Sequence, residues 1–321
     1  MRKIYYYLLT GILLLTACPA EATKFLGLKV IDKDYLMVHF RDGEVHYRDN
    51  GTGSSAYLGH SFSEGDDTLV VFGERLKLPE AQQTALWQIS SSNDKAFSTA
   101  QPVKVWRKSK PMNTDHTLTS EVDHWLFLQL PQSMKQGCSY TVSIPTGIGS
   151  DQQTATVTFD IWNQLSEAVH VNIIGYSPAE SIHAADLYQW LGDGGQRDYQ
   201  AWEGRKVYLY NTKTQKKQSV GTVKFWKKAS EADKEAGKKN LVGTDVWNID
   251  FKAAAPGRYH LVVEDVGCSM DLTSPRMSTI SLSAIPYVAT TTCASVSQRI
   301  LNMYGPYPVS HSSSQRPILR V

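Results

Sequence analysis

Short runs of alternating apolar and polar residues dominate the chain from Leu26 onward. The clearest run is Thr154 to Trp162, in which every second residue is apolar. A period of two is typical of a strand that packs one face against a core and exposes the other. No stretch keeps a helical period for more than about two turns, so the pattern predicts an all-β protein.

The first set of predicted strands lies within residues 26–163, which we assign to an N-terminal β-sandwich domain. Asp42-Gly43 separates two of these strands, and glycine tolerates the positive φ of a tight hairpin turn, so we expect a hairpin there. The expected strands are Tyr35 to Phe40, Glu44 to Arg48, Thr68 to Phe72, His124 to Leu130, Ser139 to Ile144 and Thr154 to Trp162.

A polar connector from Asn163 to Ala168 separates this set from a second one. Pro256-Gly257 provides a turn between its last two strands. These strands predict a second sandwich over residues 168–271, with strands at His170 to Ile174, Lys206 to Tyr210, Gly221 to Trp226, Val246 to Phe251 and Arg258 to Val263.

The chain begins with two cationic residues and an apolar stretch of about 12 residues, which is too short to span a bilayer and is typical of a secretory signal. Residues 15–18, Leu-Thr-Ala-Cys, resemble a bacterial lipobox. We therefore expect residues 1–17 to be a lipoprotein signal peptide, Cys18 to carry the lipid, and residues 18–25 to be the anchor and linker. Ordinary cleavage after Ala22 is the alternative.

The formal net charge is only +2, so nothing in the composition indicates a nucleic-acid partner. Cys138, Cys268 and Cys293 form an odd, widely spaced set without a disulfide or zinc pattern. The histidines lack ligand spacing, and Asp66-Asp67 fits a turn better than a calcium site. We predict no metal and no cofactor, and no Ser or Cys nucleophile arrangement is visible.

Three tryptophans lie in polar or loop-like surroundings: Trp190, Trp202 and Trp226. Exposed aromatic rings could stack on sugar rings, whereas packing in the core is the alternative for each. We take these three as candidate glycan-stacking residues. The acids Glu44, Asp123, Glu264 and Asp265 cannot be paired from the sequence as the acid and base of a glycosidase, so no catalytic residue is assigned.

Residues 171–176 (VNIIGY), 246–251 (VWNIDF) and 256–259 (PGRY) occur in an order and spacing that resemble the immunoglobulin-like domain of glycoside hydrolase family 9, a family of many bacterial cellulases. This resemblance covers about 100 residues and implies an immunoglobulin-like fold for the second sandwich. With the first sandwich, we expect two immunoglobulin-like β-sandwich domains in this chain. In that family the chemistry belongs to a downstream (α/α)6 barrel, where an aspartate activates water and a glutamate protonates the leaving oxygen. We expect that barrel to be absent here.

Residues 272–321 contain no Asp, Glu or Lys, although 20% of the whole chain is charged. A disordered tail is the alternative, but such tails lose the Ile, Leu, Val and Tyr that this segment keeps. Taking the third base of each codon with the first two of the next permits, over Arg276 to Ser297, an aromatic-rich run similar to the family's junction with its barrel. We therefore expect residues 272–321 to be an out-of-frame tail after a frameshift near Leu272.

These observations give a first hypothesis: the chain is the anchored, non-catalytic N-terminal part of a family 9 endoglucanase, inactive because the catalytic domain is missing. A free-standing glycan-binding surface lipoprotein is the alternative, and a structural spacer is a third possibility. The expected partners are β-glucan or a related polysaccharide, and the membrane through the lipid. The expected location is the bacterial outer membrane, on its periplasmic or cell-surface face.

Overall fold

The computed structural model describes residues 23–48, 68–71, 75–115, 120–172, 174–177, 182–231, 242–252 and 256–274. They belong to one compact unit that ends at Pro275. The predicted signal peptide, Cys18, Asp66-Asp67 and the tail beyond Ser274 lie outside the described residues. In the described ranges, no helix is both long and apolar enough to cross a bilayer.

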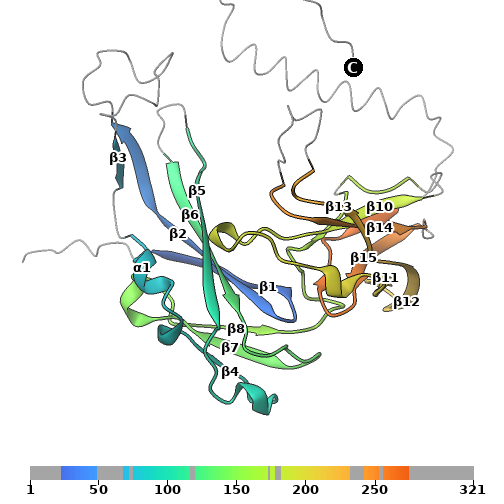
Figure 1. Ribbon diagram of the computed structural model, residues 1–321, viewed down its shortest axis with the longest axis horizontal. Helices are drawn as coiled ribbons and strands as arrows, with labels where there is room; N and C mark the ends of the chain where they lie inside the picture. Colours follow the sequence, from blue (N-terminus) through green and yellow to red (C-terminus); the bar gives the residue numbers. More distant parts are fainter. Residues whose placement is uncertain are drawn as a thin grey trace, which may run out of the picture. The chain divides into compact units, whose positions relative to one another are not determined.

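The largest sheet of the first half consists of long antiparallel strands. Its order is β1 (Lys24–Asp32), β2 (Tyr35–Arg48), β6 (Ser120–Gln129) and β5 (Lys104–Met112), and β3 (Thr68–Val71) pairs with the far end of β2 (Figure 1). β5 is therefore an edge strand, paired along one side with β6.

A smaller sheet covers one face of this sheet. It contains β4 (Gln88–Ser90), β7 (Ser139–Ser143) and β8 (Thr154–Thr158), and the core between the two sheets includes Phe40, Trp87 and Tyr140. Single turns of helix connect these strands: α1 (Leu78–Ala81), η1 (Thr84–Leu86), η2 (Lys95–Phe97) and η3 (Thr146–Ile148).

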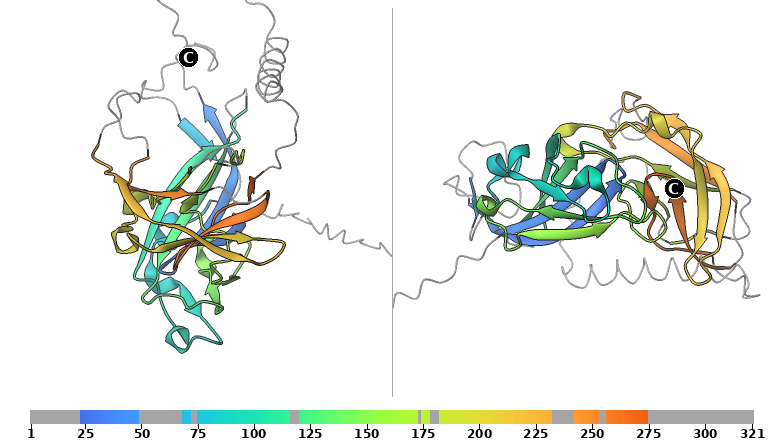
Figure 2. Two further views of the ribbon diagram at one scale, coloured as in Figure 1. Left: turned by 90° about the vertical axis from the view of Figure 1, so that its right-hand side faces the viewer. Right: turned by 90° about the horizontal axis from the view of Figure 1, so that it is seen from below.

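The second half contributes two more antiparallel sheets, which Figure 2 shows in yellow to orange from two further directions. One has the order β13 (Lys224–Lys227), β14 (Val246–Phe251), β10 (His183–Leu187) and β9 (Val169–His170). The other has the order β12 (Lys217–Thr222), β11 (Lys206–Asn211), β15 (Gly257–Val263) and β16 (Gly267–Cys268), with β17 (Leu272–Ser274) also paired to β15. The turns η4 (Gly192–Gly194) and η5 (Gln200–Trp202) precede β11.

The β1-β2-β6-β5 sheet is buried on both faces. Along β2, Leu36 and Val38 pack into the core shared with β4, β7 and β8, whereas Tyr35 and Met37 pack into the core of the second half. Adjacent side chains of a strand point to opposite faces, so this alternation divides one strand between two cores. Phe127 of β6 faces the second core in the same way, between two leucines that face the first.

This sharing contradicts the predicted fold class. The described residues are all-β, as expected, but they form four small antiparallel sheets in one compact unit rather than two immunoglobulin-like sandwich domains. The physical reason is the two-faced sheet: a self-contained sandwich would bury only one face of each sheet. The first core contains residues of the first half alone, but the second core is completed by residues of β1, β2 and β6, so the second half has no hydrophobic core of its own.

The hairpin predicted at Asp42-Gly43 is also wrong. Residues 35–48 form one continuous strand, and its pairing with β6 is irregular between Arg41 and Glu44, as in a β-bulge. The carboxylate of Asp42 points inward and accepts hydrogen bonds from Thr23, from the Leu76 backbone N–H and from His124. These three hydrogen bonds satisfy the buried carboxylate of Asp42. They therefore favour a continuous strand over a hairpin turn at this position.

Candidate functional site

A loop of the second half lies directly against the edge strand β5. Gly192 has a φ of 69°, and a Cβ at this position would lie 2.0 Å from the backbone oxygen of Arg107. A Cβ at Gly194 would lie 2.5 Å from the Trp106 ring. Only glycines permit so close an approach, so the Gly192–Gly194 turn sets where the loop sits.

Asp193, between these glycines, fastens the loop to the first half. It accepts a hydrogen bond from the backbone N–H of Arg107 at 2.5 Å and another from Gln82 at 2.9 Å. Leu191 is buried beside it and donates its N–H to the Gly195 oxygen. The loop is thus anchored directly after Trp190.

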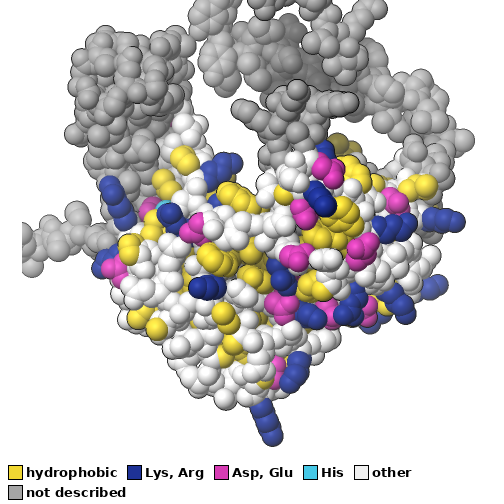
Figure 3. Space-filling model, viewed as in Figure 1, with side chains coloured by type: hydrophobic (Ala, Val, Ile, Leu, Met, Phe, Trp, Pro, Cys, Tyr) yellow, Lys and Arg dark blue, Asp and Glu magenta, His cyan; other side chains and the backbone are white. Residues whose placement is uncertain are grey.

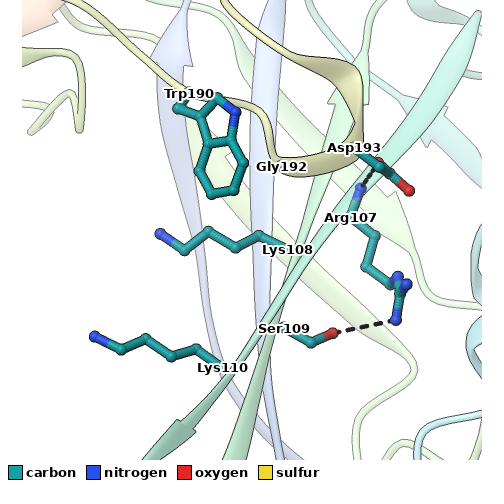
Figure 4. A pocket seen from close by; sticks show the side chains of 7 residues that line it. All are labelled: Arg107, Lys108, Ser109, Lys110, Trp190, Gly192 and Asp193. Carbon is teal, nitrogen blue, oxygen red and sulfur yellow. Dashed lines mark hydrogen bonds between the residues drawn. The ribbon is translucent and has the colours of Figure 1, made fainter. Parts of the chain in front are cut away.

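The loop and β5 together form an open cleft of about 360 Å³, which we call the β5–η4 cleft (Figure 4). This volume falls within the range of about 300–1,000 Å³ typical of small-ligand sites. In Figure 4, Lys108 and Lys110 extend from β5 to the same side as the Trp190 ring, whereas Arg107 and Ser109 point to the other side of the strand. The cleft is lined by Arg107, Lys108, Ser109, Lys110, Trp190, Gly192 and Asp193.

Aromatic rings and one ammonium group form a row across the sheet beside the cleft. His39 of β2 stacks on Trp125 of β6 with ring centroids 4.7 Å apart. The Lys108 ammonium lies 4.6 Å from the centroid of the Trp125 ring and 6.0 Å from that of Trp190. Cation–π attraction at such distances holds the lysine between the two indoles.

The charge of the cleft is positive and only partly balanced. Burial, reinforced by the neighbouring charge of Lys110, lowers the pKa of Lys108. In the part of the chain that the structure describes, neither lysine forms a salt bridge. Arg107 also has a buried Nε without a hydrogen-bond partner. By contrast, basic and acidic side chains are mixed over much of the surface that Figure 3 shows.

Of the three predicted stacking tryptophans, the structure places Trp190 in this cleft with 43% of its surface exposed. Trp226 is 60% exposed, but it lies apart from the cleft at an irregularity of the edge strand β13. Trp202 is only 5% exposed, and the guanidinium of Arg197 covers its ring at 5.0 Å. The expectation of an exposed ring is therefore wrong for Trp202, whose face is not available to a sugar.

A hydrogen-bonded Ser–His–Asp chain, which the sequence did not reveal, crosses the first sheet. Ser109 contacts Nδ1 of His124 at 2.7 Å, and Nε2 of His124 contacts Asp42 at 2.8 Å. The residue types are those of a hydrolytic triad, which is recognised by geometry and roles. Here, however, Ser109 and His124 are directly opposite each other in the β5–β6 register, and Ser109 also contacts Arg107. We therefore assign these Ser109–His124–Asp42 hydrogen bonds to stabilisation of the sheet.

Two of the four acids weighed as glycosidase candidates, Asp123 and Asp265, have structural partners. Asp123 is buried and binds Arg41 and His39. Burial raises the pKa of Asp123, but these two hydrogen bonds outweigh it and leave the pKa below its usual value. Asp265 binds Lys33 at 3.1 Å. Within the described ranges, no group of three or more His, Cys, Asp or Glu side chains is placed to hold a metal ion.

The sequence pattern did not predict the cationic side of the cleft, because β5 was not among the expected strands. The signal was present: Lys104, Arg107, Lys108 and Lys110 fall within one strand of nine residues. Alternation places Lys108 and Lys110 on one face of that strand. Only the structure shows that Trp190, some eighty residues later, lies beside that face.

Comparison with models of protein families gives no match, and no curated protein matches either. Among solved structures, the chain is similar to the bacterial S-layer protein SbsC, in structures of its domains 1–6 and of its N-terminal part. The sequence identities are 11% and 12%, and the TM-score is 0.25 in both cases. The match covers 79% of this chain but only 25% and 44% of those chains. A likeness of this size carries no argument about fold or function.

Proposed function

We propose that this chain is an exported, non-catalytic glycan-binding protein that holds polysaccharide in the β5–η4 cleft. The observation that carries the proposal is Trp190, an exposed indole that a clamped loop presents at the wall of a cleft. A pyranose ring has a face of C–H groups, which suits the electron-rich face of an indole. Lysine and arginine groups around the ring can donate hydrogen bonds to sugar oxygens.

The family 9 resemblance supports the same chemistry from the sequence side. In that setting the chain would be the anchored N-terminal part of a cellulase-like enzyme, and the cleft would keep the polysaccharide near a catalytic domain. The lipobox at Cys18 would hold it at the outer membrane, on the periplasmic or surface face. A free-standing glycan-binding lipoprotein would use the same cleft, because binding does not depend on which arrangement holds.

Co-sedimentation with insoluble polysaccharides tests the proposal. The purified full chain is mixed with cellulose, mixed-linkage β-glucan, xylan and cross-linked pectin, and the bound fraction is measured. We expect binding to at least one polymer, and we expect Trp190→Ala to weaken it roughly thirtyfold, since truncating a Trp at the centre of a binding site often costs about 2 kcal/mol.

Trp226→Ala is the matched control, because Trp226 is also an exposed indole but lies outside the cleft. It should bind as the unmodified chain does. Failure to bind any of the polymers, or equal loss in both variants, would overturn the proposal.

A further inference from the structure

We propose that the β5–η4 cleft selects a carboxylated glycan, one built from uronic acids, over a neutral one. The inference rests on the proposed function and names its ligand class. Trp190 would stack on the sugar ring, and the ammonium groups of Lys108 and Lys110 would bind its carboxylate. The three side chains extend to the same side of β5 (Figure 4).

The spacing of the two lysines is the first argument. Lys108 and Lys110 are two residues apart on one strand, so their side chains share a face and are about 7 Å apart at the backbone. Lys108 is held close to the indole side of the cleft by its contacts with Trp125 and Trp190. A carboxylate on a stacked pyranose ring would thus meet one fixed ammonium and one at the rim.

The second argument is the absence of a counter-charge in the cleft. Asp193 is the one acid among the seven lining residues, and its two oxygens already accept hydrogen bonds from Arg107 and Gln82. Burial and the charge of Lys110 lower the pKa of Lys108; Glu167 acts in the opposite direction, but it does not line the cleft and pairs with Lys29 at 2.6 Å. A bound carboxylate would stabilise the charged form of Lys108, whereas a neutral sugar would not.

A purely charge-based attraction would not need the tryptophan. The chain as a whole carries a net charge of only +2, so general attraction for polyanions is weak. The cation–π contacts tie the charge to the aromatic ring within one cleft. The combination favours a ligand that carries a sugar ring and a carboxylate together.

The test compares two forms of one polymer. Affinity electrophoresis measures binding of the full chain to polygalacturonate and to its fully methyl-esterified form, in which a neutral methyl ester replaces each carboxylate. We expect polygalacturonate to bind about tenfold more tightly, equivalent to ~1.4 kcal/mol. That preference should shrink as salt rises from 50 to 500 mM, because salt screens partly exposed charges.

Two variants and one control locate the effect. Lys108→Met combined with Lys110→Gln should abolish the preference while leaving weak binding to the esterified polymer. Trp190→Ala should weaken binding to both forms. Lys104→Gln is the control, because it removes the same charge from the same strand at an exposed position that does not line the cleft.

Three results would overturn the inference: equal binding to both polymer forms, an unchanged preference in the double lysine variant, or equally tight binding to polyglutamate, which has carboxylates but no sugar. Trp190-dependent binding to neutral β-glucan alone would overturn only this inference and leave the proposed function standing. No Trp190-dependent binding to any polymer would overturn both.

Discussion

At the scale of single residues, Gly192 has the clearest effect on the site. Its positive φ and its contact with the Arg107 backbone leave no room for a side chain. Gly195 follows three residues later with a similar φ of 72°, but a Cβ there would meet nothing within 4 Å. Substituting each glycine by alanine therefore distinguishes two free-energy costs. The substitution at Gly195 adds backbone strain alone, whereas the one at Gly192 also adds a steric clash.

Gly192→Ala should push the loop off β5, because the new Cβ would collide with backbone that cannot move aside. We expect a loss of about 2–4 kcal/mol in the free energy of unfolding, the range of a severe packing error, together with loss of glycan binding. Gly195→Ala should cost about 1–3 kcal/mol, the strain of a backbone conformation that is nearly confined to glycine, and should keep binding. Urea unfolding and co-sedimentation measure both, and equal effects of the two substitutions would contradict this account.

A second prediction at this scale concerns pH. Burial lowers the pKa of His170, although Tyr188, Asp186 and Glu167 act in the opposite direction. The unfolded chain, with a histidine pKa of about 6.5, therefore binds more protons than the folded one between the two pKa values. Stability should be fully present above pH 6.5 and should fall as the pH drops through the folded pKa.

His170→Gln can still donate a hydrogen bond to the Tyr188 oxygen, which His170 contacts at 3.1 Å. It should make the free energy of unfolding less dependent on pH between 7 and 5. Chemical unfolding at several pH values gives this slope for both proteins. If the free energy of unfolding changes with pH in the same way in both proteins, His170 does not contribute to that pH dependence.

At the scale of elements, the turn between β1 and β2 docks into the second half. Arg197 binds Asp32 and Asp34, each at 2.8 Å, and its guanidinium lies 4.7 Å from the centre of the Tyr35 ring. Asp32 is fully buried, and that burial raises its pKa although Arg197 counteracts the shift. This contact joins the two halves near their shared core.

Arg197→Ala should destabilise the chain by about 3–5 kcal/mol, because it leaves Asp32 buried without its partner. Glu167→Gln is the control: it removes the pair of Lys29 and Glu167, whose side chains are 41% and 34% exposed, and should cost less than about 1 kcal/mol. Thermal unfolding of the two variants measures both losses of stability. Similar small losses would mean that Arg197 is not what joins the halves.

At the scale of the whole molecule, the sequence predicted most strands but not how the sheets share cores. Val246 to Phe251 is a strand with the predicted bounds, because one element's alternation is a local property. The sharing was visible only as continuous apolar runs, Tyr35 to Val38 and Leu126 to Leu128, which indicate strands buried on both faces. One side of the cleft was predictable, because the polar, loop-like sequence around Trp190 indicated an exposed ring. The other side was not, because the position of β5 beside Trp190 depends on contacts between distant segments.

The central claim is that glycan binds at Trp190. The most direct measurement is a proton–nitrogen NMR titration of the tryptophan indole N–H signals with a soluble oligosaccharide, with the Trp190 signal assigned through Trp190→Phe. We expect a saturable shift of the Trp190 signal, while the signals of Trp226 and of the buried Trp247 stay in place. A shift of Trp226 alone, or no shift of any indole signal at saturating oligosaccharide, would contradict this claim.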